Sequence, residues 1–342
     1  MKTFNLLFVL SLTILSCNSN NRKEGVPVTS KSNLSFVQKK SIRVAAVQAS
    51  LTAGAVNENL EIIERLTREA FEQGAELVVL PEFFTTPPTP MEFDQDIVES
   101  IRPLIGEPLK LLQRLAKEYN GIVGGSFLAY HQAQVYNSFA LVFPDGTYFV
   151  HNKDYPTLME NCYYTGGTDD GVFDTPIGRV GIVVCLEFYR TETARRMLDR
   201  VDIVIGGSAW PSKPKEGVTS KVLTTQLADF AKMLGVPVVH GNHSGQYQSE
   251  NTPWQFVGEA QIVLGTGDIL ERRSYKEGEG IVISDIKLGK IEGSTKPIPD
   301  QFWIYSKVGW NQWETSLSGP YRDFYENTTR PFTIDKWASY NP

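Results

Sequence analysis

The sequence has little of what metal centres, disulfide-stapled domains and nucleic-acid binders require. Its 342 residues include only three cysteines and four histidines. No histidine has the spacing of a metal site or a catalytic triad, so His240 and His243 are interpreted as structural or pocket-lining residues. Lysine and arginine number 33 against 39 acidic residues, a net charge of -6 that gives no reason to expect nucleic acid as a partner.

Long apolar runs are also missing after the first residues of the chain. Met1-Lys2 precedes an apolar run from Phe4 to Leu15, which is too short to span a bilayer and has the length of a signal-peptide core. The run closes with Ile-Leu-Ser-Cys at Cys17, which resembles the lipobox of bacterial lipoproteins. In those proteins the cysteine becomes the lipidated first residue, whereas an ordinary secretory signal or a chance core cysteine would carry no lipid.

The N-terminus therefore predicts a signal peptide at residues 1–16 and a lipidated, flexible tether at residues 17–40, rich in Asn, Ser and Lys. Lipid on Cys17 would anchor the protein to a membrane of the bacterial cell envelope after export. The sequence does not say which leaflet holds the anchor.

The rest of the chain has enough apolar residues, 41% of the total, to bury a sizeable core. Strands and helices alternate at first, with strands at 42–48 and 76–80, a helix capped by Asn57, and another at 108–119. Hairpins follow. This order predicts an α/β domain over residues 41–289. Residues 290–342 are rich in aromatic side chains, which predicts an extended arm that packs on the domain or on a second subunit. The alternative is a frayed tail.

Cys185 ends a short β-branched run that begins at Gly181, and a helix is predicted to begin near Thr191. A sharp turn at that point exposes the sulfur, and nearby N–H groups with the positive end of the helix favour a thiolate. Alternatively, Cys185 is a buried core thiol or forms a disulfide with Cys162.

Two more polar residues follow predicted strands: Glu82 after Leu80-Pro81, and Lys153 after the strand that ends near Val150. Because strand ends can meet at one edge of a sheet, these side chains can converge with Cys185. Taken singly, Glu82 could be a solvated loop acid and Lys153 a surface lysine.

These motifs resemble those of the nitrilase, or carbon–nitrogen hydrolase, superfamily. Pro81-Glu82-Phe83 is similar to its glutamate motif, Lys153 to its lysine motif, and Gly181 to Glu187 to its nucleophile motif. Two later segments, Ser208 to Pro211 and the hairpin around Gly265 to Asp268, are also similar. The resemblance implies an αββα sandwich with two central β-sheets flanked by helices, a homodimer or higher homo-oligomer, and no metal or organic cofactor.

The resemblance also implies a mechanism. Cys185 would attack an amide carbonyl while Glu82 takes its proton, giving a thioester that water then hydrolyses with release of ammonia or an amine. Lys153 and the backbone N–H of Leu186 would stabilise the oxyanion. Glu160 would be a second glutamate that bonds the lysine, although a loop acid is the alternative.

Several residues are predicted to support this site. Glu187 is a candidate supporting acid, Trp210 and Tyr164 are candidate pocket residues, and Arg190 could hold a substrate carboxylate or form a structural ion pair. Tyr155 stands where many relatives carry histidine.

The residues after Cys185 lack the Cys-Trp-Glu-Asn pattern of true nitrilases, so a small-molecule amide or carbamoyl-type substrate is favoured over a nitrile. Three alternatives remain open: a nitrile hydrolase, a non-catalytic binding or scaffold lipoprotein that keeps the fold, and an acyltransferase acting on lipoprotein amines. The relatives that transfer acyl groups carry a multi-span membrane domain, which this sequence lacks.

Overall fold

The computed structural model describes residues 41–88, 93–212, 218–248, 253–292, 296–304 and 319–340. The predicted signal peptide, the tether and Cys17 lie outside these ranges. Among the described helices, none combines the length and the apolar composition that crossing a membrane requires.

The first of two sheet layers is formed around β1 (Ser41–Ala49), whose residues alternate between two apolar clusters. β1 pairs in parallel with β2 and antiparallel with β16. The other members continue from β2 in the order β4, β5 and β6, with β3 beside β4. Their bounds are β2 Leu77–Val79, β3 Arg102–Pro103, β4 Ile122–His131, β5 Gln134–Val142, β6 Tyr148–Asn152 and β16 Gly280–Lys287.

The second layer has β11 (Val238–His243) near its middle, paired in parallel with β9 and antiparallel with β14. The strand order is β7, β8, β9, β11, β14 and β15. The bounds of the other five are β7 Val172–Thr175, β8 Gly178–Val184, β9 Ile203–Ser208, β14 Gly258–Val263 and β15 Ile269–Ser274. A small separate sheet contains β10 (Pro211–Ser212), β12 (Gln246–Gln248) and β13 (Pro253–Phe256).

The two layers face each other across a core formed by alternate residues of both, including Val44 and Val79 from the first and Ile182 and Ile205 from the second. The end of β1 pairs with the end of β11, and this pairing joins the two layers into one hydrogen-bonded sheet of 13 strands. The junction consists of two residue pairs. The sandwich is therefore joined at one corner, which lies beside the ends of several strands.

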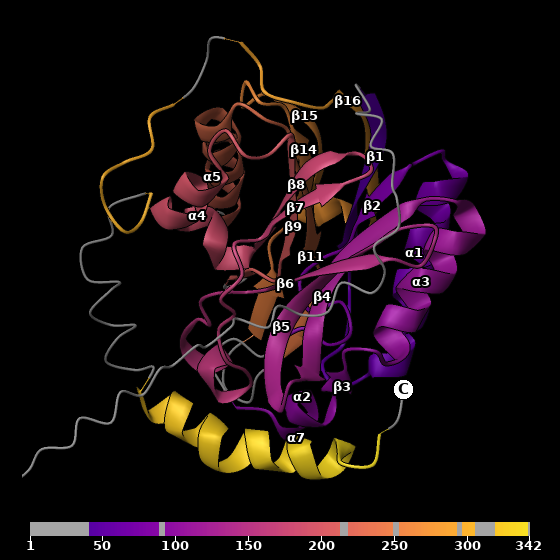
Figure 1. Ribbon diagram of the computed structural model, residues 1–342, viewed down its shortest axis with the longest axis vertical. Coiled ribbons are helices and arrows are strands. Elements are labelled where there is room, and N and C mark those ends of the chain that lie inside the picture. Colours follow the sequence, from indigo (N-terminus) through magenta and orange to yellow (C-terminus); the bar gives the residue numbers. More distant parts are fainter. Residues whose placement is uncertain are drawn as a thin grey trace, which may run out of the picture.

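Helices cover both outer faces of the sandwich, as Figure 1 shows for α1 and α3 on one side and α4 and α5 on the other. Their bounds are α1 Val56–Glu72, α2 Gln95–Glu99, α3 Glu107–Tyr119, α4 Thr191–Met197 and α5 Val218–Leu234. Three 3-10 turns add η1 Leu158–Cys162, η2 Cys185–Tyr189 and η3 Tyr275–Glu277. The predicted αββα sandwich is confirmed.

Of two predicted helix starts, the one capped by Asn57 was wrong in detail and the one near Thr191 is confirmed. Helix α1 begins after Ala55 with no side-chain cap, so Asn57 lies inside its first turn and caps nothing. Thr191 is the first residue of α4 and its hydroxyl bonds the carbonyls of Gln301 and Phe302 instead of the helix N–H groups.

The described end of the chain is mainly helical, not extended. Residues 319–324 are helical, η4 (Tyr325–Thr329) is a π-helical turn, and α7 (Arg330–Trp337) continues the same helix across the lower edge of the sandwich (Figure 1). Tyr325 is fully buried, and its hydroxyl donates to Gln134 and accepts from the Val135 N–H. The described part of the arm thus packs on β5 of its own domain.

Candidate functional site

The corner where the two layers join brings strand ends from both layers together. Gly207 in β9 lies close to the backbone of Leu80 to Glu82. A Cβ at Gly207 would lie 2.6 Å from the Glu82 nitrogen. A Cβ at Gly241 would lie 2.6 Å from the Leu80 carbonyl carbon. Larger residues at these two positions would push the layers apart, so the glycines allow Glu82 to reach the end of the second sheet.

Glu82 is buried and its carboxylate is hydrogen-bonded on both oxygens. Oε1 accepts from Asn137 Nδ2 at 2.8 Å and from Lys153 Nζ at 3.0 Å, and Oε2 accepts from the Ala209 N–H at 2.9 Å. The Cys185 thiol also donates to this carboxylate. Burial, reinforced by the charge of Glu160, raises the pKa of Glu82, while Lys153 opposes the rise.

Lys153 is fully buried and lies between two glutamates. Its Nζ donates to both oxygens of Glu160, at 3.0 and 2.8 Å, as well as to Glu82. Glu160 also accepts from the Tyr164 hydroxyl at 2.8 Å and from the Thr157 N–H at 2.6 Å. Burial acts to lower the pKa of Lys153, but the two carboxylates outweigh it and raise that pKa well above its usual value. Lys153 is therefore a fixed positive charge.

Cys185 is partly exposed and has a left-handed backbone with φ of 52°. Such a conformation costs on the order of 1–3 kcal/mol for a residue with a Cβ and persists only where its surroundings hold it. Burial of the sulfur and the charge of Glu82 raise the pKa of Cys185 well above its usual value, and Lys153 only partly opposes them. The positive end of α4 lies six residues after Cys185, so it is remote from the sulfur. The raised pKa favours the thiol form of Cys185 in the resting site.

Glu187 forms a second buried ionic cluster on the other side of the nucleophile turn. Its carboxylate accepts from the Val184 N–H at 2.7 Å and from the Asp154 N–H at 2.9 Å, and it contacts His151 Nε2 at 3.0 Å. Since Val184 precedes Cys185 and Asp154 follows Lys153, one side chain ties the nucleophile strand to the lysine strand.

The charged groups of this cluster are paired with groups of opposite charge: His151 with Glu187 and Asp169, and Arg196 with Glu187. Burial acts to lower the pKa of His151, but the charges of Glu187 and Asp169 outweigh it and raise that pKa to about 10. The pKa of Glu187 is held below its usual value despite burial, first by His151 and then by Arg196. These shifts favour the ionised forms of His151 and Glu187 at neutral pH.

Arg190, which the sequence left between two roles, forms an ion pair with Asp154 at 2.6 Å. Its guanidinium lies over the rings of Tyr155 and Phe302, 5.1 and 5.3 Å from their centroids. These contacts support the structural ion pair, in which Asp154 also pairs with Arg196 at 2.5 Å.

The remaining predicted residues lie around η2. Leu186 is buried as the second residue of this turn, which places its backbone N–H next to Cys185. Trp210 follows β9 and stacks on Tyr189, the last residue of η2, with ring centroids 5.0 Å apart. Cys162 and Cys185 are both free thiols, so the disulfide alternative is wrong.

The geometry described so far can be compared with known proteins. The model of the carbon-nitrogen hydrolase family matches residues 43–295. The chain belongs to the carbon-nitrogen hydrolase family. An N-carbamoylputrescine amidase of Solanum tuberosum is 28% identical over 265 residues, 73% of this chain and 88% of that protein. An omega-amidase of Xenopus laevis is 32% identical over 269 residues, 75% and 92% of the two chains.

Solved structures share the fold of this carbon-nitrogen hydrolase. Nit3 of Saccharomyces cerevisiae, a member of the nitrilase superfamily, matches with a TM-score of 0.62 and 22% identity over 73% of this chain and 91% of that one. A mutant amidase of Nesterenkonia sp. AN1, with acrylamide added at its active-site cysteine, matches with a TM-score of 0.59 and 18% identity over 72% and 93%.

Sequence reasoning missed several polar residues of this carbon-nitrogen hydrolase site, among them Asn137, His151 and Asp169. Asn137 and His151 are buried polar residues within apolar strands, which is a signal of special surroundings but does not name the partner. Arg196 lies in the helix predicted after Cys185, but no role was predicted for it. The partners of Asn137 and His151, Glu82 and Glu187, come from segments remote in sequence.

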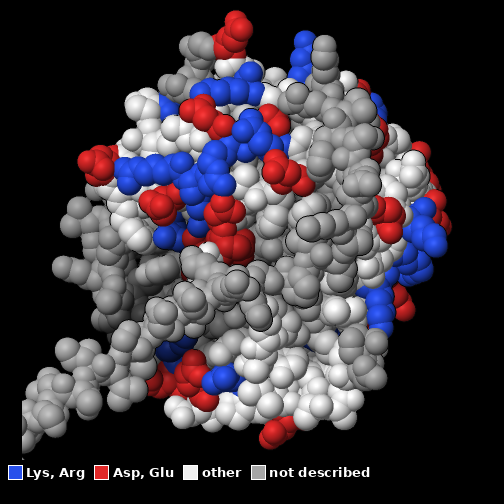
Figure 2. All heavy atoms as spheres, in the orientation of Figure 1, with Lys and Arg blue, Asp and Glu red and all other residues white. Residues whose placement is uncertain are grey.

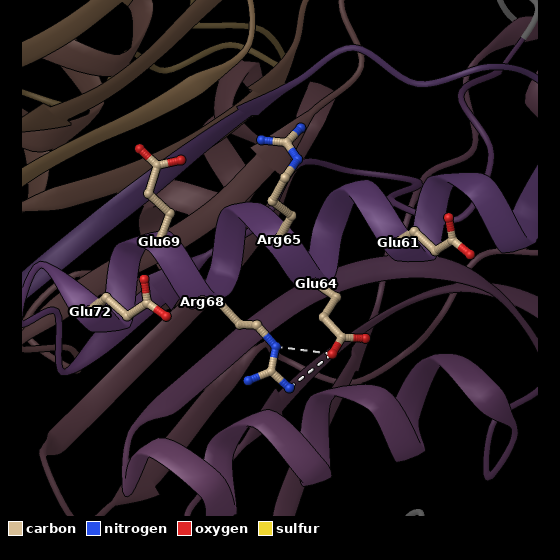
Figure 3. A pocket seen from close by; sticks show the side chains of 6 residues that line it. All are labelled: Glu61, Glu64, Arg65, Arg68, Glu69 and Glu72. Carbon is tan, nitrogen blue, oxygen red and sulfur yellow. Dashed lines mark hydrogen bonds and ion pairs between the residues drawn. The ribbon is translucent and has the colours of Figure 1, made fainter.

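An open pocket elsewhere on this carbon-nitrogen hydrolase does not include the candidate catalytic residues. It lies on α1 and is lined by six charged side chains, shown in Figure 3: Glu61, Glu64, Arg65, Arg68, Glu69 and Glu72. Glu64 and Arg68 pair there at 2.9 Å. On the face shown in Figure 2, positive and negative side chains intermingle in the same way.

Proposed function

We propose that this chain hydrolyses a non-peptide carbon–nitrogen bond of an amide or carbamoyl compound through a thioester on Cys185. The observation that supports this most directly is that Glu82 contacts both the Cys185 thiol and the Lys153 ammonium. A base, a nucleophile and a fixed cation within one buried hydrogen-bonded group meet the requirements of acyl transfer.

In the first half of the proposed reaction the thiol proton passes to Glu82 as sulfur attacks the carbonyl carbon. The raised pKa of Glu82 makes its carboxylate a stronger base, and the raised pKa of Cys185 keeps the proton on the sulfur until the carboxylate takes it. Lys153 and the Leu186 N–H stabilise the oxyanion, and a donor of this kind contributes about 3 kcal/mol. The carbon–nitrogen bond then breaks, Glu82 returns the proton to the leaving nitrogen, and ammonia or an amine departs.

In the second half, water attacks the thioester. Glu82 takes a proton from that water, the carbon–sulfur bond breaks, and the proton returns to the Cys185 sulfur as the acid leaves. Glu160 keeps Lys153 in place throughout, through its two bonds to Nζ and its bond from Tyr164. Glu187 positions the two strands, and Trp210 supports the turn from the side.

The substrate class follows from the relatives and from the motif after Cys185. The named relatives are an N-carbamoylputrescine amidase and omega-amidases, which favours small linear amides or carbamoyl amines over nitriles. No metal or organic cofactor enters any step, and all proton transfers are assigned to this chain's own residues.

The experiment is mass spectrometry of the intact protein during turnover of a panel of linear amides and carbamoyl amines, with ammonia measured in parallel. Wild type is expected to gain the mass of the acyl group, and Cys185→Ala to gain none. Glu82→Gln serves as the matched control, since it keeps the thiol but lacks the base. Turnover by Cys185→Ala at the wild-type rate would refute the proposal.

We further propose that the domain is held on a bacterial envelope membrane by lipid on Cys17 and that it works as a homodimer or higher oligomer. The lipobox-like sequence supports the first part and the family resemblance the second. Metabolic labelling with palmitate, compared between wild type and Cys17→Ala, tests the anchor. Equal labelling of both proteins contradicts it, and a monomeric mass by light scattering contradicts the oligomer.

A further inference from the structure

Residues 301–304 lie beyond the part of the chain that the family model matches, which ends at residue 295. They nevertheless cross directly over the end of the nucleophile turn. The Ile304 N–H donates to the Tyr189 carbonyl at 2.8 Å, and Arg190 and Trp303 form an antiparallel bridge. Trp303 and Ile304 are buried in the cluster that also contains Leu186.

Thr191, the first residue of α4, completes this attachment. Its N–H donates to the Phe302 carbonyl at 3.1 Å, and its hydroxyl donates to the carbonyls of Gln301 and Phe302. Phe302 also covers Arg190, whose partner Asp154 follows Lys153 in sequence. The segment 301–304 therefore contacts the chain just after Cys185 and the ion pair just after Lys153.

The last described helix reaches the same site from the carboxylate side. Tyr325 is fully buried in a cluster with Phe83, Tyr164 and Ala209. Each of these three adjoins Glu82 or its network: Phe83 follows Glu82, the Tyr164 hydroxyl bonds Glu160, and the Ala209 N–H bonds Glu82. The Thr329 hydroxyl donates to the carbonyl of Cys162, at the end of η1.

From these contacts we infer that the chain beyond the family domain is a positioning element of the active site, with residues 301–304 holding the nucleophile turn and Tyr325 to Thr329 backing the glutamates. The strained backbone of Cys185 needs fixed neighbours on both sides. Glu187 supplies them before the cysteine through Val184, and the 301–304 segment supplies them after it through Tyr189 and Thr191. The chemistry assigned to Cys185 rests on the proposed function, but its position can be measured separately.

The test uses Thr191→Val in the full chain, which removes the hydroxyl bonds to the segment and keeps the side-chain shape. Thr67→Val is the matched control, because Thr67 is equally buried and its hydroxyl bonds the Ile63 carbonyl within α1. Thr191→Ser, which restores the hydroxyl, is the rescue variant. The readouts are the rate and pH profile of Cys185 alkylation by iodoacetamide, kcat and KM, and the thermal midpoint.

Thr191→Val is expected to change the alkylation rate of Cys185 and lower kcat about tenfold with little change in KM, since small misplacement of a reacting atom is costly. Thr67→Val is expected to lower the thermal midpoint and leave alkylation as in wild type. A second pair of variants changes exposed side chains, so neither removes a buried side chain from the core. Phe302→Ala is expected to alter the alkylation rate of Cys185, and Phe332→Ala, a change at similar exposure on α7, is expected to leave that rate unchanged.

The inference is overturned if Thr191→Val and Phe302→Ala match their controls in the alkylation rate and pH profile. Because alkylation needs no substrate, this outcome is distinct from failure of the proposed function, which shows as absence of turnover and acyl adduct in wild type.

Discussion

Two buried ionic clusters lie on either side of Cys185, and they use similar residues to opposite effect. The first contains Glu82, Lys153 and Glu160; the second contains Glu187 and His151 with Asp169 and Arg196. Both place carboxylates against buried cations and bond them to backbone N–H groups. They differ in how completely each charge is matched.

In the first cluster two carboxylates share one ammonium, and a thiol adds a third acidic group. Burial raises the pKa values of Glu82 and Cys185, and the neighbouring carboxylates add to the rise. In the second cluster three carboxylates, counting Asp154, face one imidazolium and the two guanidiniums of Arg196 and Arg190. These charges outweigh burial, so the pKa of Glu187 is lowered and that of His151 is raised to about 10. The comparison indicates that the first cluster transfers protons and the second holds strands in place.

The largest expected effect comes from Glu82→Gln. The amide keeps the shape of the side chain but cannot accept the thiol proton, and Lys153 retains Glu160 as a partner. We expect kcat on the best amide to fall about 10²–10⁴-fold, the range typical for loss of a general base. A variant with more than a tenth of wild-type kcat would contradict the role of the first cluster.

Glu187→Gln is expected to act mainly on stability. Removing this charge leaves His151 and Arg196 with fewer partners, and breaking a buried pair typically costs about 3–5 kcal/mol. Urea denaturation measures the loss. Asp170→Asn is the control, since it removes an exposed pair with Arg200 and should cost under about 1 kcal/mol. Equal losses of unfolding free energy in the two variants would show that the second cluster does not stabilise the fold.

The pH dependence of the second cluster is a third way to separate the two. Because the folded pKa of His151 is raised from 6.5 to about 10, its contribution to stability is fully present below pH 6.5 and is lost as pH rises towards 10. The slope in that window is at most about 1.4 kcal/mol per pH unit. Glu187, with a lowered pKa, contributes above its ordinary 4.5 and loses that contribution on acidification.

Proton NMR of the four histidines checks this directly. His240 and His243 are buried without an acidic partner, which lowers their pKa values to about 3 and about 4, and burial also lowers that of His131. Above pH 6.5, one imidazole is expected to titrate, near pH 10, and it should vanish from the spectrum of His151→Gln. A titration midpoint near pH 6.5 for that signal would contradict the prediction, because His151 would then be neutral above that pH.

The smallest effect is expected at the surface network of α1 and α3, which neither cluster includes. Glu64 bonds Arg68 and Arg114, and these bonds, Arg114 first, lower its pKa to about 2 although it is partly exposed. Glu64→Gln should lower the free energy of unfolding by under about 1 kcal/mol, less in high salt, and leave kcat unchanged. A loss as large as that of Glu187→Gln would mean that burial does not distinguish the clusters.

The sequence by itself predicted the αββα sandwich, the family, and the strand-end positions of Glu82, Lys153 and Cys185. The strand-end positions follow from local patterns, apolar alternation with a polar residue after the strand, and three such residues in the family's order carry the resemblance. The resemblance in turn implied the sandwich. Glu160 was predicted through the resemblance, and the structure places it against Lys153.

Tertiary structure alone decided the rest. Asn137 reaches Glu82, His151 reaches Glu187 and Tyr325 reaches β5 across 55, 36 and about 190 residues of chain, and no local pattern encodes such pairings. The shift in the pKa of Cys185 has the same origin, since local sequence favoured a thiolate and only the burial and charge of the assembled site raise the thiol pKa. Local pattern thus determined which residues stand at the strand ends, and three-dimensional packing determined what each does there.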